Sequence, residues 1–287
     1  MIRQSDLLIR HTEKGIAILL LVPSVGFFSN VTGSNKENPM PQSETASPVS
    51  ENKLLAALSA KCYNRLLPEL EMVEMTIGKI LYSPKQQIKY VYFPRWAAVS
   101  MVNIFEDGSM VEVGVVGREG MVGISLLSGD DISPHQAIVQ IADGGSRMKT
   151  AVFKKEIETN GELANISRRY LQALFTQVAQ TASCNRMHSI AQRLARWMLL
   201  MQDRVELDVL NLTHEFISTM LGTRRAGVTI AAGTLQTAGI IRYHRGKVTI
   251  LDQKRLEEAS CECYKIVRNE YDRLLGGYDP AENRKGK

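Results

Sequence analysis

Hydrophobic and polar positions alternate in short runs from about residue 68 to residue 153, as they do in β-strands. The runs are ELEMVEMTIGKILY, IKYVYFPRWAAVSMVNIF, SMVEVGVVG, HQAIVQIADG and SRMKTAVF, and Ser-Pro at 83–84 and Asp-Gly at 107–108 mark turns between them. One amphipathic helix, LLAALSAKCYNRLL, precedes the strands and ends before Pro68. The pattern predicts an antiparallel β-roll or barrel of about 90 residues.

A helical period then begins near Glu162 and continues without proline to Arg204. One side of this predicted helix is marked at three- and four-residue steps by Leu171, Leu174, Val178, Thr181 and Asn185. A small β-roll cannot bury so long a stripe, so we expect a partner helix in a symmetric parallel dimer. The alternative is a shorter helix that breaks between residues 184 and 188 and packs within its own chain.

Residues 212–251 have the pattern of a helix-turn-helix. Thr213 is a plausible N-cap of the first helix, which is expected to end at 221–223, where Gly222 permits a positive φ. A second helix begins near Arg224 and ends at Gly239. Its buried positions follow the i, i+3, i+4, i+7 rule at Val228, Ala231, Ala232 and Leu235. Two helices joined by a short glycine-containing turn form this motif.

The exposed face of the second helix is predicted to present Arg225, Gly227 and Thr229, with Gly227 keeping the surface low enough to approach base edges. Residues 240–250 then read as a β-hairpin that turns at Arg245 and Gly246, the wing of a winged helix.

Charge supports this interpretation. The whole chain has a net charge of +5 and residues 213–250 have +4, because Glu215 is their only acidic residue. The five cations of this segment are Arg224, Arg225, Arg242, Arg245 and Lys247. A localised positive surface beside such a helix is typical of a DNA-binding protein. The alternative is a structural helical hairpin with a solvated charged face.

Residues 1–51 are predicted to be disordered or an upstream over-extension, and residues 276–287 a flexible tail. Arg3, Arg10 and Lys14 precede an apolar run at 15–28 that resembles a signal-peptide core and is shorter than the roughly 20 residues of a membrane span. The following segment is rich in Ser, Pro, Asn and Glu. Because Met40 lies inside it, we expect translation to begin there.

The four cysteines, Cys62, Cys184, Cys261 and Cys263, form no CxxC pair and have no metal-ligand spacing. We expect reduced thiols in a cytoplasmic protein, no metal site and no stable membrane association. A redox pair of Cys261 and Cys263 is the alternative, although such tight spacing is more often accidental. The sequence has no GxSxG, HExxH or P-loop, so no catalytic site is predicted.

Five motif strings resemble the Crp/Fnr family of bacterial transcription regulators, over residues 52–275. They are VYFP at 91–94, EDGSMVEVGVVGREGMVG at 106–123, CNRMHSIAQRLARWML at 184–199, LTHEFISTMLGTRRAGVT at 212–229 and SCECY at 260–264. The resemblance is strongest to a branch whose sensor domains have no assigned ligand.

This resemblance implies an α+β fold with three parts: a cyclic-nucleotide-binding-like β-roll sensor at 52–160, a dimerisation helix at 161–204 and a winged helix-turn-helix at 205–275. It implies a homodimer that reads a twofold-symmetric operator in double-stranded DNA, and it leaves RNA polymerase open as a further partner. The competing interpretation is a ligand-binding or protein-interaction sensor whose winged helix contacts a protein.

In the family, the second helix enters the major groove and its N-terminal arginine, here Arg225, reads a base. Such a contact with guanine contributes about 1–3 kcal/mol of discrimination. Thr213 matches a position that touches phosphate, and further phosphate contacts are implied for Arg224, Thr229, Arg242, Arg245 and Lys247. Ala226 and Gly227 stand where relatives often have Glu and Ser or Thr, so their operator should not be transferred.

The glycines at 114, 117, 120 and 123 fit neither the GxGxxG order nor a P-loop. The resemblance places Gly117, Glu119, Gly120 and Gly123 in the effector pocket. The sequence has no arginine from 119 to 146 and has two aspartates at 130–131, so cyclic AMP is not expected there.

Two other sensor chemistries also lack their usual ligands. An iron–sulfur cluster of the family's type needs several cysteines near the N-terminus, and only Cys62 is available. Haem needs an axial ligand, and His135 is a lone loop histidine. We therefore predict no cofactor and leave the effector open.

Overall fold

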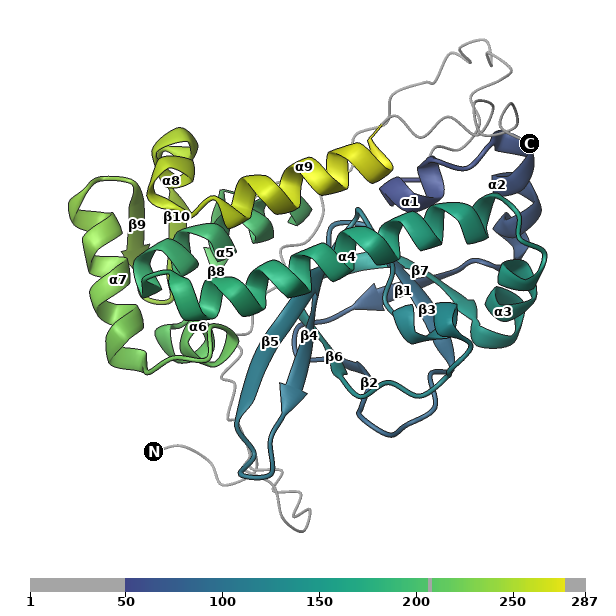
Figure 1. Ribbon diagram of the computed structural model, residues 1–287, viewed down its shortest axis with the longest axis horizontal. Helices are drawn as coiled ribbons and strands as arrows, with labels where there is room; N and C mark the ends of the chain where they lie inside the picture. Colours follow the sequence, from purple (N-terminus) through teal and green to yellow (C-terminus); the bar gives the residue numbers. More distant parts are fainter. Residues whose placement is uncertain (1–49, 206–207, 277–287) are drawn as a thin grey trace, which may run out of the picture. The chain divides into compact units, whose positions relative to one another are not determined.

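The computed structural model describes residues 50–205 and 208–276 (Figure 1). The predictions for the first 49 residues, including the start at Met40, and for the tail beyond Gly276 lie outside the described residues. Within the described ranges, no helix has both the length and the apolar character needed to cross a membrane.

Two antiparallel sheets form the predicted β-roll. The first has the order β2-β6-β4-β5, with strands Ile80–Tyr82, Gln136–Ile141, Ala98–Ile104 and Met110–Val116. The second has the order β1-β7-β3, with strands Glu71–Met75, Asp143–Lys149 and Tyr90–Pro94. Their inward side chains, among them Phe93, Val99 and Val139, are fully buried in one apolar cluster. Alternating patterns with turn residues between them therefore predicted this part correctly.

The helix predicted ahead of the strands is two helices, α1 (Lys53–Ala56) and α2 (Ala60–Leu66), and a 3-10 turn, η1 (Leu67–Glu69), follows them. The single-helix prediction was wrong because Ser59 is the N-cap of a second helix. The Ser59 hydroxyl accepts a hydrogen bond from the backbone N–H of Cys62 at 3.3 Å. Asn52 caps α1, and its side-chain amide also donates to the carbonyls of Pro94 and Gly120, at 2.9 Å each.

The segment SRMKTAVF was predicted as one strand, and only its first half is one. Strand β7 ends at Lys149, and α3 (Thr150–Glu158) begins directly after it. The Thr150 hydroxyl donates to the Ile88 carbonyl at 2.6 Å, and Phe153 is buried in the core of the roll. Tertiary packing of Phe153 therefore overrides the local preference of this run for β-structure. A second 3-10 turn, η2 (Ile124–Ser128), follows Gly123, whose φ is +115°.

The long helix predicted over 161–204 is broken into α4 (Glu162–Met187) and α5 (Ile190–Val205). His188 is extended at the break. Ser189 and Gln192 then form a capping box. The backbone N–H of Gln192 donates to the Ser189 hydroxyl at 3.3 Å, and the backbone N–H of Ser189 donates to the side-chain oxygen of Gln192 at 3.1 Å. The break agrees with the alternative of a shorter helix.

The apolar stripe on α4 also differs from the predicted one. Leu174 is only 3% exposed because it packs against the β-roll. The outward-facing apolar positions include Leu171 and Phe175, which are 39% and 63% exposed, and Ala182. The helix therefore buries one side within its own chain and leaves another side, centred on Phe175, open.

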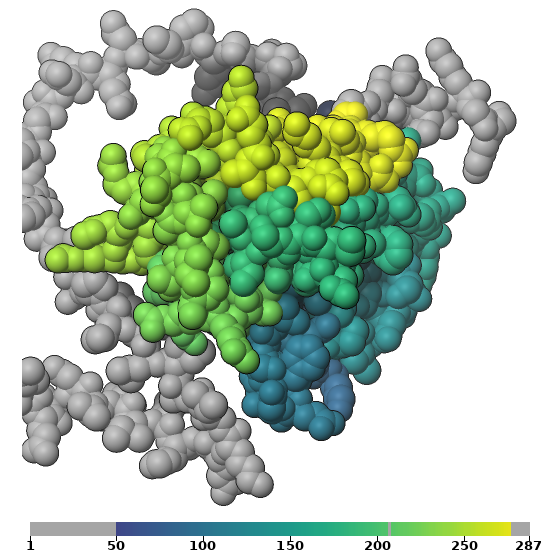
Figure 2. Space-filling model, turned by 60° about the vertical axis from the view of Figure 1, so that its left-hand side comes forward, coloured from purple at the N-terminus to yellow at the C-terminus, as the bar shows by residue number. Residues whose placement is uncertain are grey.

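The C-terminal part is a winged helix-turn-helix, as predicted. Its helices are α6 (His214–Met220), α7 (Arg225–Thr237), α8 (Gln253–Ala259) and α9 (Cys263–Leu275), and its sheet has the order β8-β10-β9, with strands Val209–Asn211, Lys247–Ile250 and Ile241–His244. The predicted buried positions of α7 are all buried, from Val228 to Leu235. Helix α9 packs on α4, and Figure 2 shows this yellow helix against the teal one.

A buried carboxyl group connects α5 with the β-roll. Glu112 on β5 accepts hydrogen bonds from the Trp197 indole nitrogen, at 2.9 Å, and from the Ser100 hydroxyl. Burial raises the pKa of Glu112 to about 7 from its ordinary value of 4.5, and the two hydrogen bonds only partly oppose this shift. The native state therefore holds a proton on Glu112 at a pH where the unfolded chain has released it.

A raised native pKa gives stability that is full below the unfolded pKa and is lost as the pH rises through the native value. We expect the free energy of unfolding to fall between about pH 5 and about pH 8, with up to about 3 kcal/mol of the loss due to Glu112. Glu112→Gln, which resembles the protonated form, should flatten this part of the profile in urea unfolding. The exposed control Glu74→Gln should keep the wild-type profile. Identical profiles for Glu112→Gln and wild type would contradict this assignment.

Candidate nucleic-acid interface and effector pocket

The turn between α6 and α7 has the geometry that the sequence predicted. Gly222 has a φ of +57°, and Arg224 is the extended N-cap residue of α7. Thr213 caps α6, where its hydroxyl accepts a hydrogen bond from the Phe216 amide at 3.1 Å. Because the hydroxyl oxygen of Thr213 is the acceptor in that bond, its own hydrogen remains available for donation to a second acceptor.

The exposed face of α7 carries a different glycine from the one predicted. Arg225 lies on this face with 70% of its side chain exposed, and Thr229 is exposed too. Gly227 faces α5 instead: a Cβ atom there would lie 2.6 Å from the Cδ1 of Ile190. The prediction that Gly227 lies on the exposed face of α7 was wrong. Gly227 lies against α5, where the absence of a side chain makes room for Ile190.

Two residues of this face were missed from the sequence. Ile230 is 72% exposed, and a Cβ atom on Gly233 would meet nothing within 4 Å. With Arg225, Ala226 and Thr229 they follow three- and four-residue steps along α7. The exposure of Ile230 and Gly233 could therefore have been predicted from the sequence, because both lie on the side of the helix opposite the buried positions.

Hydrogen bonds and ring stacking hold α6, α7 and the wing together. His214 stacks on Tyr243 with ring centroids 4.3 Å apart, and its Nδ1 lies 3.0 Å from the Thr229 hydroxyl. The Tyr243 hydroxyl donates to the Leu212 carbonyl at 2.7 Å. Burial and then Arg225 lower the pKa of His214, so the ring is neutral at pH 7. The Thr229 hydroxyl also donates to the Arg225 carbonyl, so its proton is engaged within the chain.

The wing turns through Arg245 and Gly246, whose φ angles of +48° and +77° are those of a tight hairpin turn. All five predicted cations have exposed side chains: Arg224, Arg225, Arg242, Arg245 and Lys247. Glu215 lies 4.0 Å from Arg225, and both side chains are mostly exposed, so this pair holds Arg225 only weakly.

The predicted effector pocket is packed with the side chains of the chain itself. A Cβ atom at Gly120 would lie 2.2 Å from the Tyr170 ring, and one at Gly117 would lie 2.5 Å from the Cβ of Arg204. Gly123 keeps its positive φ beside β3. Gly117 and Gly120 therefore make room for side chains from α5 and α4 rather than leaving space for a ligand.

Glu119 forms an ion pair with Arg204, at 3.1 Å between Oε1 and Nε, and the Arg204 side chain is 4% exposed. The same guanidinium donates to the carbonyls of Val115, at 3.2 Å, and Leu200, at 2.6 Å, and to the side chain of Gln177. Burial acts to lower the pKa of Arg204, but Glu119 and other groups leave it above its ordinary value, so the group stays charged. Arg204 of α5 thus places a cation beside the predicted effector pocket, and this cation is already paired with Glu119.

A cavity of about 500 Å³ opens beside this ion pair. Its lining includes Glu119, Asp203, Asp208, Arg204 and Arg268. Lys53 and Asp272 also line this cavity, so both signs of charge meet there, and the expectation about cyclic AMP stays a prediction.

Residues that sequence spacing did not connect lie together at the break between α4 and α5. Cys184, His188, Cys261 and Cys263 have potential ligand atoms that all lie within 4.8 Å of one another. The expectation of no metal site rested on spacing along the chain, and that argument cannot detect ligands from segments 77 residues apart.

Comparisons with known proteins agree with this architecture. Residues 192–259 match the model of the Crp-like helix-turn-helix domain, which begins within α5, ahead of the boundary predicted at 205. The global nitrogen regulator of Synechococcus elongatus is 22% identical over 219 residues, which cover 73% of this chain and 97% of that protein.

Two solved structures share the fold. FixK2 from Bradyrhizobium japonicum has a TM-score of 0.58 and 16% identity, over 67% of this chain and 98% of its own. A transcriptional regulator of the Crp/Fnr family from Eubacterium rectale has a TM-score of 0.57 and 19% identity, over 72% of this chain and 96% of its own. These findings define a protein with a β-roll and a Crp-like helix-turn-helix domain. The chain therefore carries a Crp-like helix-turn-helix domain and shares its fold with a Crp/Fnr regulator, as the sequence patterns predicted.

The tight packing at Gly120 can be tested by adding one methyl group. We expect Gly120→Ala to lower the free energy of unfolding by about 1–3 kcal/mol, because the buried Tyr170 ring must move. Gly233→Ala is the matched control: its methyl group enters open space on a helix and should leave stability unchanged or raise it by up to about 1 kcal/mol. Equal effects of the two substitutions in chemical denaturation would contradict the packing.

Proposed function

We propose that this chain is a cytoplasmic, homodimeric transcription regulator that reads a twofold-symmetric DNA operator through α7, with the β-roll as its effector or allosteric domain. The observation that carries the proposal is the exposed face of α7, with Arg225 at its N-terminal end and the cations of the wing beside it. A helix presented in this way fits the major groove of DNA.

The side chains of α7 suggest how this surface reads bases. Arg225 is the first residue of the helix and is free enough to make a bidentate contact with guanine. Ile230 offers an apolar contact for a thymine methyl group, and Gly233 lets the helix approach closely. Thr213, Arg224 and the wing cations are suited to phosphate contacts, which set the register of the protein on DNA. Thr229 braces the interface through His214.

A second copy of the chain is the proposed partner of α4. The exposed apolar positions Leu171, Phe175 and Ala182, together with the half-buried Val178, follow a coiled-coil spacing. In a symmetric dimer this stripe meets its own copy, and the two α7 helices are then expected to read half-sites about 34–36 Å apart.

Contacts between the β-roll and the helix-turn-helix provide a route for regulation. A Cβ atom at Gly222 in the turn between α6 and α7 would lie 2.8 Å from Val111 on β5. Arg204 on α5 is held by Glu119 of the roll. A change in the roll that moves β5 or Glu119 therefore shifts both ends of the DNA-reading unit.

The test of DNA binding is selection of fragments from a random DNA pool by the purified full chain, followed by sequencing. We expect a shared twofold-symmetric site. Arg225→Ala should lose at least about tenfold in affinity for that site, as expected for a guanine contact, while leaving non-specific binding and the oligomeric state unchanged. The control Arg255→Ala, an exposed arginine on α8, should keep wild-type affinity.

The competing interpretation, in which the winged helix binds a protein, predicts a different result. Binding to DNA through the wing requires affinity to fall steeply with salt, and Lys247→Ala should reduce the slope of log affinity against log salt by about 1. A pool with no enriched site and no salt-dependent binding would reject the proposed function in favour of a protein partner.

The dimer is tested separately. Phe175→Lys should give a monomer in analytical ultracentrifugation at concentrations where the wild type is a dimer, because a charge then lies at the centre of the apolar stripe. The fold should persist, since the Phe175 side chain is 63% exposed within one chain. The control Gln172→Lys lies on the same helix, off the stripe, and should remain dimeric. A dimeric Phe175→Lys protein would place the interface elsewhere.

A further inference from the structure

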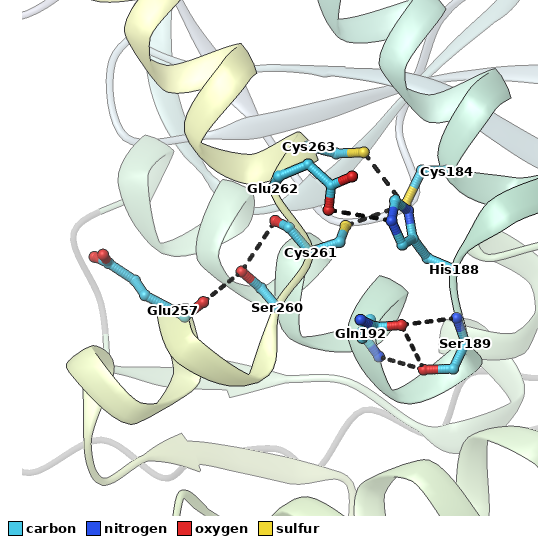
Figure 3. Close-up of polar contacts among 9 residues, drawn as sticks. All are labelled: Cys184, His188, Ser189, Gln192, Glu257, Ser260, Cys261, Glu262 and Cys263. Carbon is cyan, nitrogen blue, oxygen red and sulfur yellow. Dashed lines mark hydrogen bonds and ion pairs between the residues drawn. The ribbon is translucent and has the colours of Figure 1, made fainter.

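Three cysteines and one histidine converge where α4, α5 and α9 meet (Figure 3). Cys184 lies in the last turn of α4, His188 at the break before α5, Cys261 in the segment between α8 and α9, and Cys263 at the start of α9. The three cysteines are at most 4% exposed, and the His188 side chain is 16% exposed. The four side chains therefore form a closed, nearly dry cluster.

Two distances in this cluster are close to those of a tetrahedral zinc site, and all four ligand atoms lie within 4.8 Å of one another. Zn–S bonds of about 2.3 Å and Zn–N bonds of about 2.0–2.1 Å place ligand atoms about 3.6–3.8 Å apart. The Cys184 and Cys261 sulfurs are 3.4 Å apart, and the Cys263 sulfur is 3.7 Å from His188 Nδ1. An iron–sulfur cluster needs a wider cage, because its ligands bind different iron atoms. The cluster therefore fits a single ion.

The orientation of His188 is a second, independent observation. Its Nε2 lies 3.2 Å from the Glu262 carboxylate, while its Nδ1 faces the Cys263 sulfur. When Nε2 donates its hydrogen to Glu262, the lone pair of Nδ1 points toward the sulfurs. A carboxylate that holds the second nitrogen in this way is the usual outer partner of a metal-binding histidine.

The surroundings of the cluster also suit a bound cation. Cys184, Cys261 and Cys263 form an apolar cluster of their own, apart from the two larger cores of the described residues. Three thiolates, a neutral histidine and one Zn²⁺ carry a net charge of −1. Arg196 on α5 is 3% exposed and lies within electrostatic reach of Cys184 and Cys263, so a compensating cation is in place.

We propose that Cys184, His188, Cys261 and Cys263 bind one Zn²⁺ ion in a closed structural site. Four protein ligands leave no position for water, so the ion supports the fold rather than catalysis. It ties the break between α4 and α5 to the start of α9, and so fixes the angle between the helix that covers the β-roll and the helix-turn-helix. The site does not depend on the proposed DNA binding.

The test is the metal content of the full chain, purified under reducing conditions without chelators or a histidine tag. Mass spectrometry of the elements should find about one zinc per chain. After removal of zinc under reducing conditions, Co²⁺ should restore one equivalent and give the intense thiolate-to-cobalt absorption of a tetrahedral sulfur-rich site. Cys261→Ser and Cys263→Ser should reduce the zinc content at least about tenfold. The matched control Cys62→Ser changes the fourth buried cysteine, which lies in α2, and should keep the metal.

Glu262→Ala provides a milder variant, because the Glu262 side chain is 70% exposed and its loss should not unfold the protein. Loss of an outer partner of this kind is expected to weaken zinc affinity about 10–100-fold in a chelator competition. Wild-type protein that is folded and reduced, yet contains no zinc and takes up neither Zn²⁺ nor Co²⁺, would overturn the proposal. So would a disulfide between Cys184 and Cys261 in protein isolated with its thiols trapped.

Discussion

A buried arginine joins the two halves of the described chain. The guanidinium of Arg204 comes from α5, beside the helix-turn-helix, and lies within the β-roll among the carbonyl of Val115, the side chain of Gln177 and the carboxylate of Glu119. A buried charge costs several kcal/mol unless it is paired and hydrogen-bonded. Because these partners come from β5, α4 and the loop after β5, the charge is satisfied only when all of these parts are assembled. Gly117 is required beside it, since any side chain there would collide with Arg204.

The break between α4 and α5 allows one continuous stretch of sequence to serve two cores. Helix α4 packs Leu174 into the β-roll, whereas α5 packs Trp197 into the core that it shares with α7 and the wing. A straight helix could not present these faces to both cores. The hydrogen bonds between Ser189 and Gln192 stabilise the break. Cys184 before the break lies close to Cys261 and Cys263 near the start of α9, so an ion bound by them would fix the angle of the break.

The proposed recognition surface is prepared before any ligand arrives. His214, Thr229 and Tyr243 lock α6, α7 and the wing in one arrangement, so little ordering is required on binding. The two glycines of α7 allow close approach on different sides of the helix. Gly227 lets α7 pack closely on Ile190 of α5, and Gly233 leaves open space on the exposed side.

Local patterns in the sequence were sufficient for the strands of the roll, the buried positions of α7 and the turn at Arg245 and Gly246. Periodicity and turn chemistry are written within a few neighbouring residues, so they can be read without knowing the fold. The Ser189 and Gln192 cap was equally local but was overlooked within a long helical run. The side of Gly227, the burial of Arg204 and the meeting of Cys184 with Cys261 depend on partners distant in the sequence. Such contacts arise only when packed elements bring those partners together, because spacing along a chain carries no information about distance across a core.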